Sequence, residues 1–298
     1  MKRLLYLIFL LPGLLACSKK QPAGSDAAAE VVFNLSFNRS LSAYQTVDVK
    51  AASPLVRNFV CVYKVNSAGQ VANQEKPDYS FSWEGEKASY TATLPVGSYR
   101  VMAWSDQQQD GASALWDPSD FTAIKMAAGH VGSDECVRAF MGKADLSITD
   151  DGNRALTVPM ASPQGKFVIV SAEKQQAQTD GLSVRITYSA YMPSAFGMFE
   201  DKPVDSQTGV SFVVLPQPAD DGTVLMGFDY VLTNGTEASV PLHMEVLTED
   251  GTPASDFNFT VPMVRGKITT VRGEFLSGAS HSAVTIDTSF EDEYNFYF

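Results

Sequence analysis

Apolar and polar side chains alternate with a period of two through most of this chain of 298 residues. Phe33, Leu35 and Phe37, for example, are separated by single polar residues. This spacing places successive side chains on opposite faces of a β-strand, so one face of each such strand is predicted to be buried. The same pattern is found in residues 90–94, 182–188 and 257–263.

Two further runs, residues 59–65 and 210–215, are apolar on both faces and are predicted as central strands. Helical periodicity is scarce, and only residues 133–142 suggest a short helix. Asx-Gly pairs, whose residues tolerate positive φ, separate the predicted strands. Short strands punctuated by tight turns predict an all-β protein made of β-sandwiches. The pairs are Asp110-Gly111, Asp151-Gly152, Asp180-Gly181, Asp221-Gly222, Asn234-Gly235 and Asp250-Gly251.

The first residues have the order of a bacterial lipoprotein signal. Lys2 and Arg3 precede an apolar run that is shorter than the roughly 20 residues needed to cross a bilayer. The run ends in Leu-Leu-Ala-Cys at Ala16 and Cys17, which is the order that lipoprotein signal peptidase cleaves. Residues 1–16 are therefore predicted to be removed, and Cys17 is predicted to carry acyl chains that give a stable membrane anchor. The alternative is an ordinary secretory signal in which Cys17 is incidental.

The rest of the chain divides into a tether and two predicted domains. Residues 17–30 are polar and without periodicity, which is typical of a flexible tether. Two prolines and a glycine interrupt the strand pattern at residues 159–166. We therefore expect an N-terminal β-sandwich at 31–162 and a C-terminal one at 163–298. The anchor predicts a location at a membrane.

Charge and cysteine content restrict the partners and the covalent chemistry. The formal net charge of −12 argues against nucleic acid as a partner, because neutralising phosphates requires a basic face. Besides Cys17, the chain has Cys61 and Cys136, which an oxidising compartment would allow to form a disulfide. The alternative is a pair of buried thiols that act as small apolar side chains.

Motifs for catalysis and metal binding are absent from the sequence. No two of the three histidines have zinc-site spacing, and neither a Gly-x-Ser-x-Gly elbow nor a phosphate-binding glycine loop is present. We therefore expect no catalytic residue, no metal and no cofactor, and we predict that the protein is not an enzyme. Trp83, Trp104 and Trp116 could form a sugar-stacking platform or could be ordinary core aromatics.

Several short motifs resemble those of one protein family. Residues 94–104 run Leu-Pro-Val-Gly-Ser-Tyr-Arg-Val-Met-Ala-Trp, and residues 138–142 run Arg-Ala-Phe-Met-Gly. Residues 261–265 and 284–296 are similar to the closing strands of the same family. Together with the lipoprotein signal and tether, these motifs resemble the fimbrillin superfamily, whose members are lipoproteins of anaerobic Gram-negative bacteria. They supply the stalk, anchor and accessory subunits of surface fimbriae. The resemblance therefore implies a lipid-anchored location at the outer membrane, at the cell surface or within a fimbrium.

The resemblance implies two tandem transthyretin-like, Greek-key β-sandwiches that assemble with other fimbrial subunits by β-strand addition. Tyr294, Phe296 and Phe298 have the alternation of an inserted strand, or equally of an intramolecular edge strand. In stalk subunits a protease cuts after an early arginine, for which only Arg39 and Arg57 are available. Arg39 follows a predicted strand without a clear loop, which favours an uncut anchor or accessory subunit. A lipid-anchored protein that binds a host or glycan ligand is the alternative function.

Overall fold

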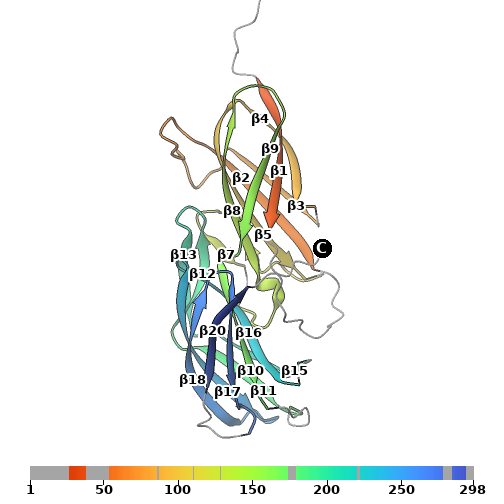
Figure 1. Cartoon of the computed structure of the whole chain (residues 1–298), viewed down its shortest axis with the longest axis vertical. Helices are drawn as coiled ribbons and strands as arrows, with labels where there is room; N and C mark the ends of the chain where they lie inside the picture. The colour runs from red at the N-terminus through yellow and green to blue at the C-terminus, as the bar shows by residue number, and fades with distance from the viewer. Residues whose placement is uncertain are drawn as a thin grey trace, which may run out of the picture.

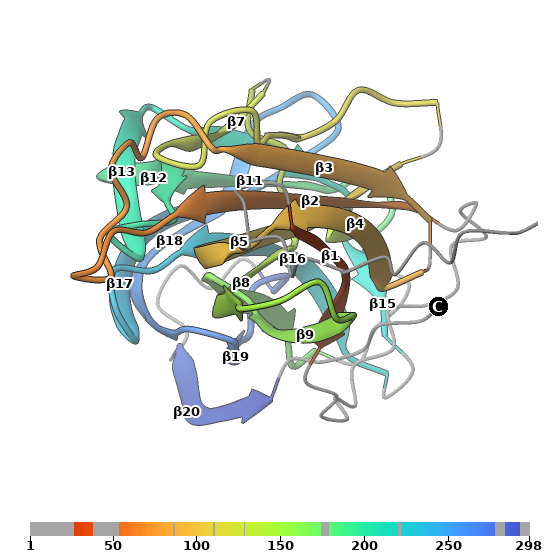
Figure 2. The same cartoon turned by 90° about the horizontal axis from the view of Figure 1, so that it is seen from above.

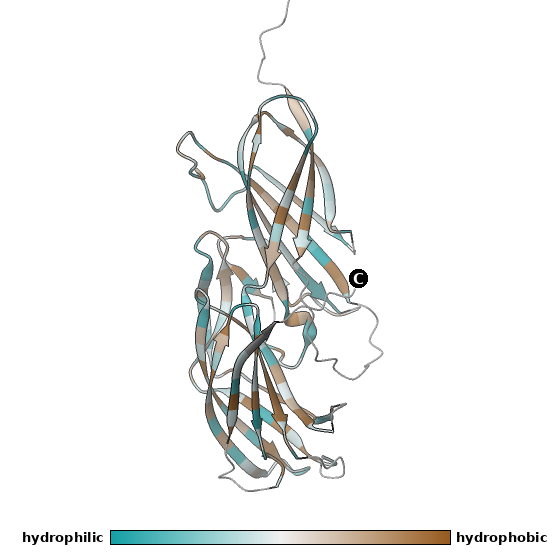
Figure 3. Ribbon diagram, viewed as in Figure 1, coloured by the Kyte–Doolittle hydropathy of each residue, from teal (hydrophilic) through white to brown (hydrophobic). Residues whose placement is uncertain are grey.

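The computed structural model describes residues 27–37, 54–85, 87–109, 111–127, 129–173, 179–219, 222–277 and 284–292. Within these ranges the chain is almost entirely strands and turns, and the helical structure is a short 3₁₀ turn, η1 (Glu135–Val137). The all-β fold predicted from the alternation is confirmed. Figure 3 shows the basis of that prediction, because apolar and polar residues succeed one another along the strands of both lobes.

The first lobe is a single seven-stranded sheet, drawn in the upper half of Figure 1. Most neighbouring strands are antiparallel, but β1 lies parallel to β9. In spatial order the strands are β3 (Tyr79–Glu84), β2 (Leu55–Lys64), β5 (Gly97–Gln108), β8 (Ala139–Ile148), β9 (Arg154–Ala161), β1 (Ala28–Phe37) and β4 (Ser89–Pro95).

This sheet curls until its two edge strands approach each other, as Figure 2 shows from above. Trp83 on β3 stacks on Tyr90 of β4, with ring centroids 5.2 Å apart and an interplanar angle of 20°. Phe81 of β3 also contacts Tyr90, at 5.3 Å between centroids. The inner face holds a core that includes Phe33 and Val60. The sandwich is thus one sheet folded over its own apolar face.

The Leu-Pro-Val-Gly-Ser-Tyr motif builds the turn between β4 and β5. The Tyr99 hydroxyl donates a hydrogen bond of 2.9 Å to the Pro95 carbonyl oxygen, and its ring is buried. A Cβ atom on Gly97 would lie 3.2 Å from that ring, so the glycine makes room for it. The local contacts of this turn therefore explain why a proline, a glycine and a tyrosine occur at this spacing.

The second lobe consists of two sheets packed over a separate core that includes Phe167, Met244 and Phe257. The five-stranded sheet has the order β15 (Gln217–Pro218), β16 (Val224–Leu232), β10 (Gln164–Ser171), β19 (Lys267–Gly273) and β20 (Thr285–Asp292). The four-stranded sheet has the order β14 (Ser211–Val214), β11 (Ser183–Tyr188), β17 (Glu237–Leu247) and β18 (Pro253–Val264).

A fourth sheet joins the two halves of the chain at the junction between the lobes. We call this junction the waist. The sheet has the order β13 (Lys202–Thr208), β12 (Tyr191–Gly197), β7 (Ile124–Met126) and β6 (Trp116–Asp117). Strands β6 and β7 precede the link Ser162–Pro163 between β9 and β10, where the sequence predicts the domain boundary, whereas β12 and β13 follow it. Each half therefore contributes strands to one sheet.

A shared apolar core lies beside this fourth sheet and contacts both lobes. Trp104 and Trp116 from the first half are 0% and 1% exposed, and their rings meet edge to face at 5.5 Å between centroids. Phe196 from the second half lies 6.4 Å from Trp104. Val168, Val170, Phe228, Tyr230, Leu232 and Ile268 belong to the same cluster. Apolar burial on this scale couples the two lobes.

Two predictions from the sequence are wrong. Residues 210–215 do not form a central strand, because β14 is an edge strand on which Val213 and Leu215 are 57% and 71% exposed. Residues 133–142 form η1 and the start of β8 rather than a helix. In both segments the secondary structure depends on which distant strands pair with each other. A short local sequence pattern does not specify that pairing. The central position predicted for residues 59–65 is confirmed, since β2 lies between β3 and β5.

The shared core leads us to expect cooperative unfolding of both lobes. Trp104→Ala should lower the free energy of unfolding by about 3–5 kcal/mol, because it leaves a cavity in the core that both lobes contact. Trp83→Ala, at a half-buried position within the first lobe alone, is the matched control. Denaturant titration followed by circular dichroism and fluorescence should give coincident transitions for the wild type. Two separate transitions, with only one shifted by Trp104→Ala, would contradict the coupling.

Candidate functional site

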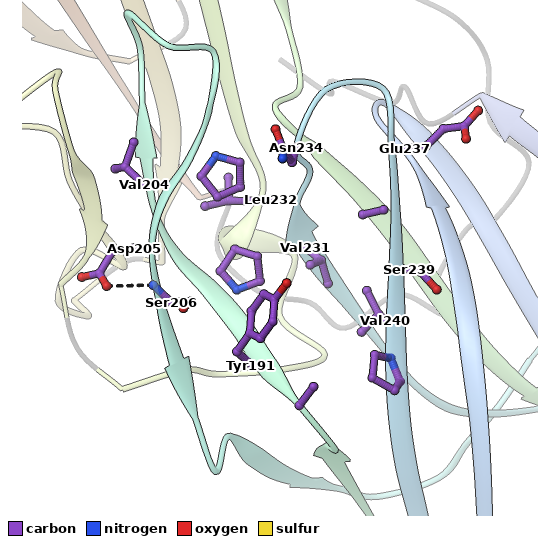
Figure 4. A pocket seen from close by; sticks show the side chains of 15 residues that line it. Tyr191, Val204, Asp205, Ser206, Val231, Leu232, Asn234, Glu237, Ser239 and Val240 are labelled. Atoms are coloured by element: carbon purple, nitrogen blue, oxygen red, sulfur yellow. Dashed lines mark hydrogen bonds between the residues drawn. The ribbon is translucent and has the colours of Figure 1, made fainter.

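The second lobe has a surface groove of about 630 Å³ between the β12–β13 hairpin and strands β16 and β17. Figure 4 shows Tyr191 lying between the two walls. Tyr191 is 66% exposed and Val204 on β13 is 41% exposed, so both present apolar surface to solvent. The other lining residues include Pro193, Pro203, Val231, Leu232, Val240 and Pro241.

Charged groups lie at the margins of this groove. Figure 4 shows the carboxylates of Asp205 and Glu237 on opposite outer sides, turned away from Tyr191. The Asp205 carboxylate accepts a hydrogen bond of 2.8 Å from the backbone N–H of Ser206. The middle of the groove is consequently an apolar strip with polar residues at its borders.

One wall of the groove has backbone groups without a strand partner among the described residues. Strand β17 pairs with β18 along its whole length, but its pairing with β11 ends at Leu242, opposite Tyr188. One further hydrogen bond of 3.0 Å runs from the Ser189 N–H to the Pro241 carbonyl oxygen. The pairing between these two segments ends there. In an antiparallel strand alternate residues face the same neighbour, so Ser239 presents its N–H and carbonyl to the groove. A free strand edge of this kind can pair with another extended chain.

The opposite wall is held in place by contacts that span the molecule. Ala195 and Phe196 of β12 pair with Lys125 and Ile124 of β7, and the Phe196 ring is buried in the shared core. Arg265 fixes the hairpin turn, because its Nη1 donates to Asp201 Oδ1 at 2.8 Å.

The same arginine also anchors the hairpin to the end of β16. Arg265 Nε donates to Thr233 Oγ1 at 3.1 Å, and the guanidinium lies 5.6 Å from the centroid of the Phe196 ring. The groove therefore has a fixed width set by ordered side chains.

Arg57, one of the two arginines considered for proteolytic processing, lies on β2 and contacts residues of β5 and β6. Its Nε and Nη2 donate to the two carboxylate oxygens of Asp106 at 2.7 and 2.9 Å, and Nη2 also donates to the Trp116 carbonyl oxygen at 2.9 Å. Burial raises the pKa of the Asp106 carboxyl more than Arg57 and Trp104 lower it. A protease would have to open the paired strand β2 to reach this bond.

The other residues singled out in the sequence are dispersed. Cys61 and Cys136 are buried free thiols, so no disulfide joins them, and burial is the main cause that raises the pKa of each to about 12. The three tryptophans do not form a platform, because Trp104 and Trp116 are core residues. Ala16, Cys17, Arg39 and the aromatic residues at 294, 296 and 298 lie outside the described residues.

His130 is a buried polar residue whose structural role the sequence did not indicate. Its Nε2 lies 2.5 Å from Asp229 Oδ2, and the Tyr188 hydroxyl donates to the same oxygen at 2.6 Å. Burial, and then the Asp229 charge, raise the pKa of Tyr188. Nearby, the Ser133 N–H donates to the Phe228 carbonyl oxygen at 2.8 Å. The segment before η1 thus belongs to the first half of the chain but is held in the core of the second lobe.

The sequence matches the DUF6562 family, a family of unknown function, over residues 24–297. The chain belongs to this family. No curated protein matches it. Searches of the described residues for a group of metal-binding side chains, and for a helix long and apolar enough to cross a membrane, find neither.

Solved structures show that this DUF6562 protein shares its fold with proteins of Bacteroides. A proposed cell adhesion protein from Bacteroides ovatus is 9% identical, with a TM-score of 0.56 over 91% of this chain and 100% of that one. A proposed adhesin from the same species is 9% identical, with a TM-score of 0.53 over 91% and 97% of the two chains. A fimbrial anchor protein from Porphyromonas gingivalis is 8% identical, with a TM-score of 0.49 over 90% and 100%.

The structural role of the Arg57–Asp106 pair can be tested directly. Arg57→Ala leaves a buried carboxylate without its partner and should lower the free energy of unfolding by about 3–5 kcal/mol. The matched control is Arg100→Ala, which breaks the exposed pair with Asp145 and should cost less than about 1 kcal/mol. Urea denaturation measures both. Equal effects of the two substitutions would contradict a structural role for Arg57.

Proposed function

We propose that this protein is a non-enzymatic cell-surface lipoprotein that acts as an anchor or accessory subunit of a fimbrium. Three features support the proposal. The fold is shared with proposed adhesins, the sequence motifs resemble fimbrillins, and the N-terminus has a lipoprotein signal that ends at Cys17. In the proposed arrangement, acyl chains on Cys17 hold the protein at the outer membrane and residues 17–30 separate the lobes from it.

The observation that carries the assembly proposal is the free edge of β17 beside the exposed Tyr191. We propose that the groove accepts an extended apolar segment of another fimbrial subunit. Backbone groups of Ser239 would pair with the incoming strand, while Tyr191, Val204 and the prolines would contact its alternate side chains. The apolar strip supplies desolvation energy that a polar edge alone would lack.

The proposed anchor role does not require cleavage after Arg57. That residue lies within a paired strand, and cutting there would separate β1 from the rest of the chain. Strand β1 contributes Val31, Phe33 and Leu35 to the core of the first lobe. We therefore propose that the mature protein begins at Cys17 and remains uncut.

The groove can be tested in the bacterium that makes the protein. Wild-type protein should copurify with isolated surface filaments, and the double variant Tyr191→Asp/Val204→Asp should not, because two carboxylates in the apolar strip would have to lose their hydration. The control is Val213→Asp, which alters another exposed apolar residue on the edge strand β14. Copurification of the double variant at the wild-type level would exclude the groove, and absence of the wild-type protein from filaments would exclude the fimbrial role.

Anchoring is tested separately. Wild-type protein should enter the detergent phase of a Triton X-114 separation, whereas Cys17→Ala should remain in the aqueous phase, because the acyl chains provide the membrane affinity. Mass spectrometry of the wild-type protein should place its first residue at Cys17. A chain that begins at Ser40 or Asn58 would show processing after Arg39 or Arg57 and would contradict the uncut anchor.

A further inference from the structure

The connection between β16 and β17 carries the one Asn-Gly pair of the sequence, Asn234-Gly235. Both residues of the pair are exposed to solvent. Asn234 and Glu237 line the groove of the second lobe, and Figure 4 shows the Asn234 side chain near Leu232 at one end of it. A change in the charge of Asn234 would therefore act directly on the groove.

The reactive groups of this pair are not engaged by the fold. The Thr233 N–H donates to the Pro163 carbonyl oxygen at 3.1 Å, and the Thr233 hydroxyl donates to the Gly235 carbonyl oxygen at 3.2 Å. Neither the Gly235 N–H nor the Asn234 side-chain amide has a hydrogen-bond partner among the described residues. The backbone nitrogen of Gly235 and the side-chain carbonyl of Asn234 are thus free to react with each other.

The space around Gly235 is also open. Its φ is +72°, and a Cβ atom built on it would have no heavy atom within 4 Å. Because glycine has no side chain, nothing on the residue itself shields its nitrogen. The asparagine side chain can consequently reach that nitrogen without displacing a neighbour.

The chemistry of such a pair needs only water. The Gly235 nitrogen forms a bond to Cγ of Asn234 while the Cγ–Nδ2 bond breaks. The proton of the Gly235 N–H passes through solvent to the leaving nitrogen, which departs as ammonia. Water then opens the cyclic imide at either of its carbonyl carbons. The product is a chain with aspartate or isoaspartate in place of Asn234, and either one adds a negative charge.

Asn66 shows how the fold restrains the same reaction elsewhere. Its Oδ1 accepts hydrogen bonds of 3.0 Å from the backbone N–H groups of Ala68 and of Gln70. Rotating this side chain for attack by the Ser67 nitrogen would break both bonds, each of which contributes to the stability of the turn. Exposure alone therefore does not make an asparagine of this protein reactive.

We propose that Asn234 is a site of spontaneous deamidation selected by the fold, and that the resulting carboxylate weakens binding at the groove. The second part rests on the proposed function of the groove. An incoming segment that covers the new carboxylate would remove part of its hydration. The carboxylate also adds to the negative charge of Asp205 and Glu237 at the borders. The groove would thus distinguish newly made protein from protein that has aged without a partner.

The modification is tested on the full mature chain without any partner. The protein is incubated at mildly alkaline pH and physiological temperature, and peptide mapping by mass spectrometry follows each asparagine. Asn234 should convert at least about tenfold faster than Asn66, and mostly to isoaspartate. In urea the ratio of the two rates should fall, because Asn66 loses its hydrogen bonds. Conversion of Asn234 no faster than that of Asn66 would overturn the proposal. An unchanged ratio in urea would also overturn it, since the fold would then not select the site.

The effect on the groove is tested by copurification with surface filaments. Asn234→Asp should reduce the amount of copurified protein by about two- to fivefold, which is the effect usual for one exposed charge. The matched control Asn234→Gln keeps the amide and should copurify as the wild type does. Equal amounts of the two variants would overturn the effect on the groove. Absence of the wild-type protein from filaments would overturn the proposed function and, with it, the effect on the groove, whereas the result from mass spectrometry would stand.

Discussion

The apolar core at the waist is the contact on which the rest of this structure depends. Trp104 and Trp116 from the first half of the chain are fully enclosed by residues of both halves, including Phe196. A linker between independent sandwiches would leave these large side chains exposed, at a cost of several kcal/mol. Because β6 and β7 pair with β12 and β13, backbone hydrogen bonds also cross the junction. Both apolar packing and strand pairing therefore connect the two lobes.

Polar groups buried near this core give it a defined geometry. Arg57 satisfies Asp106 in a bidentate contact, and Gln164 bonds to the backbone of Ala139 and Val137 across the link between the lobes. Apolar contacts alone would allow the lobes to slide, whereas the Gln164 hydrogen bonds are satisfied in one relative position. His130 has a similar role, since its contact with Asp229 holds the segment before η1 against β16.

The groove in the second lobe lies next to this core. Phe196 belongs to the core and to β12, whose pairing with β7 connects the β12–β13 hairpin to the first half of the chain. The other wall is β17, whose pairing with β11 ends at Leu242. The two walls of the groove are therefore positioned by different contacts, one in the shared core and one in the four-stranded sheet of the second lobe.

The sequence by itself determined the strands, because alternation such as that of Phe33, Leu35 and Phe37 is a local property of the chain. It also contained the turn motif around Gly97 and Tyr99. It could not show that Trp104 and Trp116 are core residues, that residues 210–215 form an edge strand, or that residues 133–142 are not a helix. It also could not locate the groove, because Tyr191, Val204 and Ser239 are brought together by three separate strands. Those outcomes depend on which strands pair, and pairing between distant segments is decided by tertiary packing rather than by local pattern.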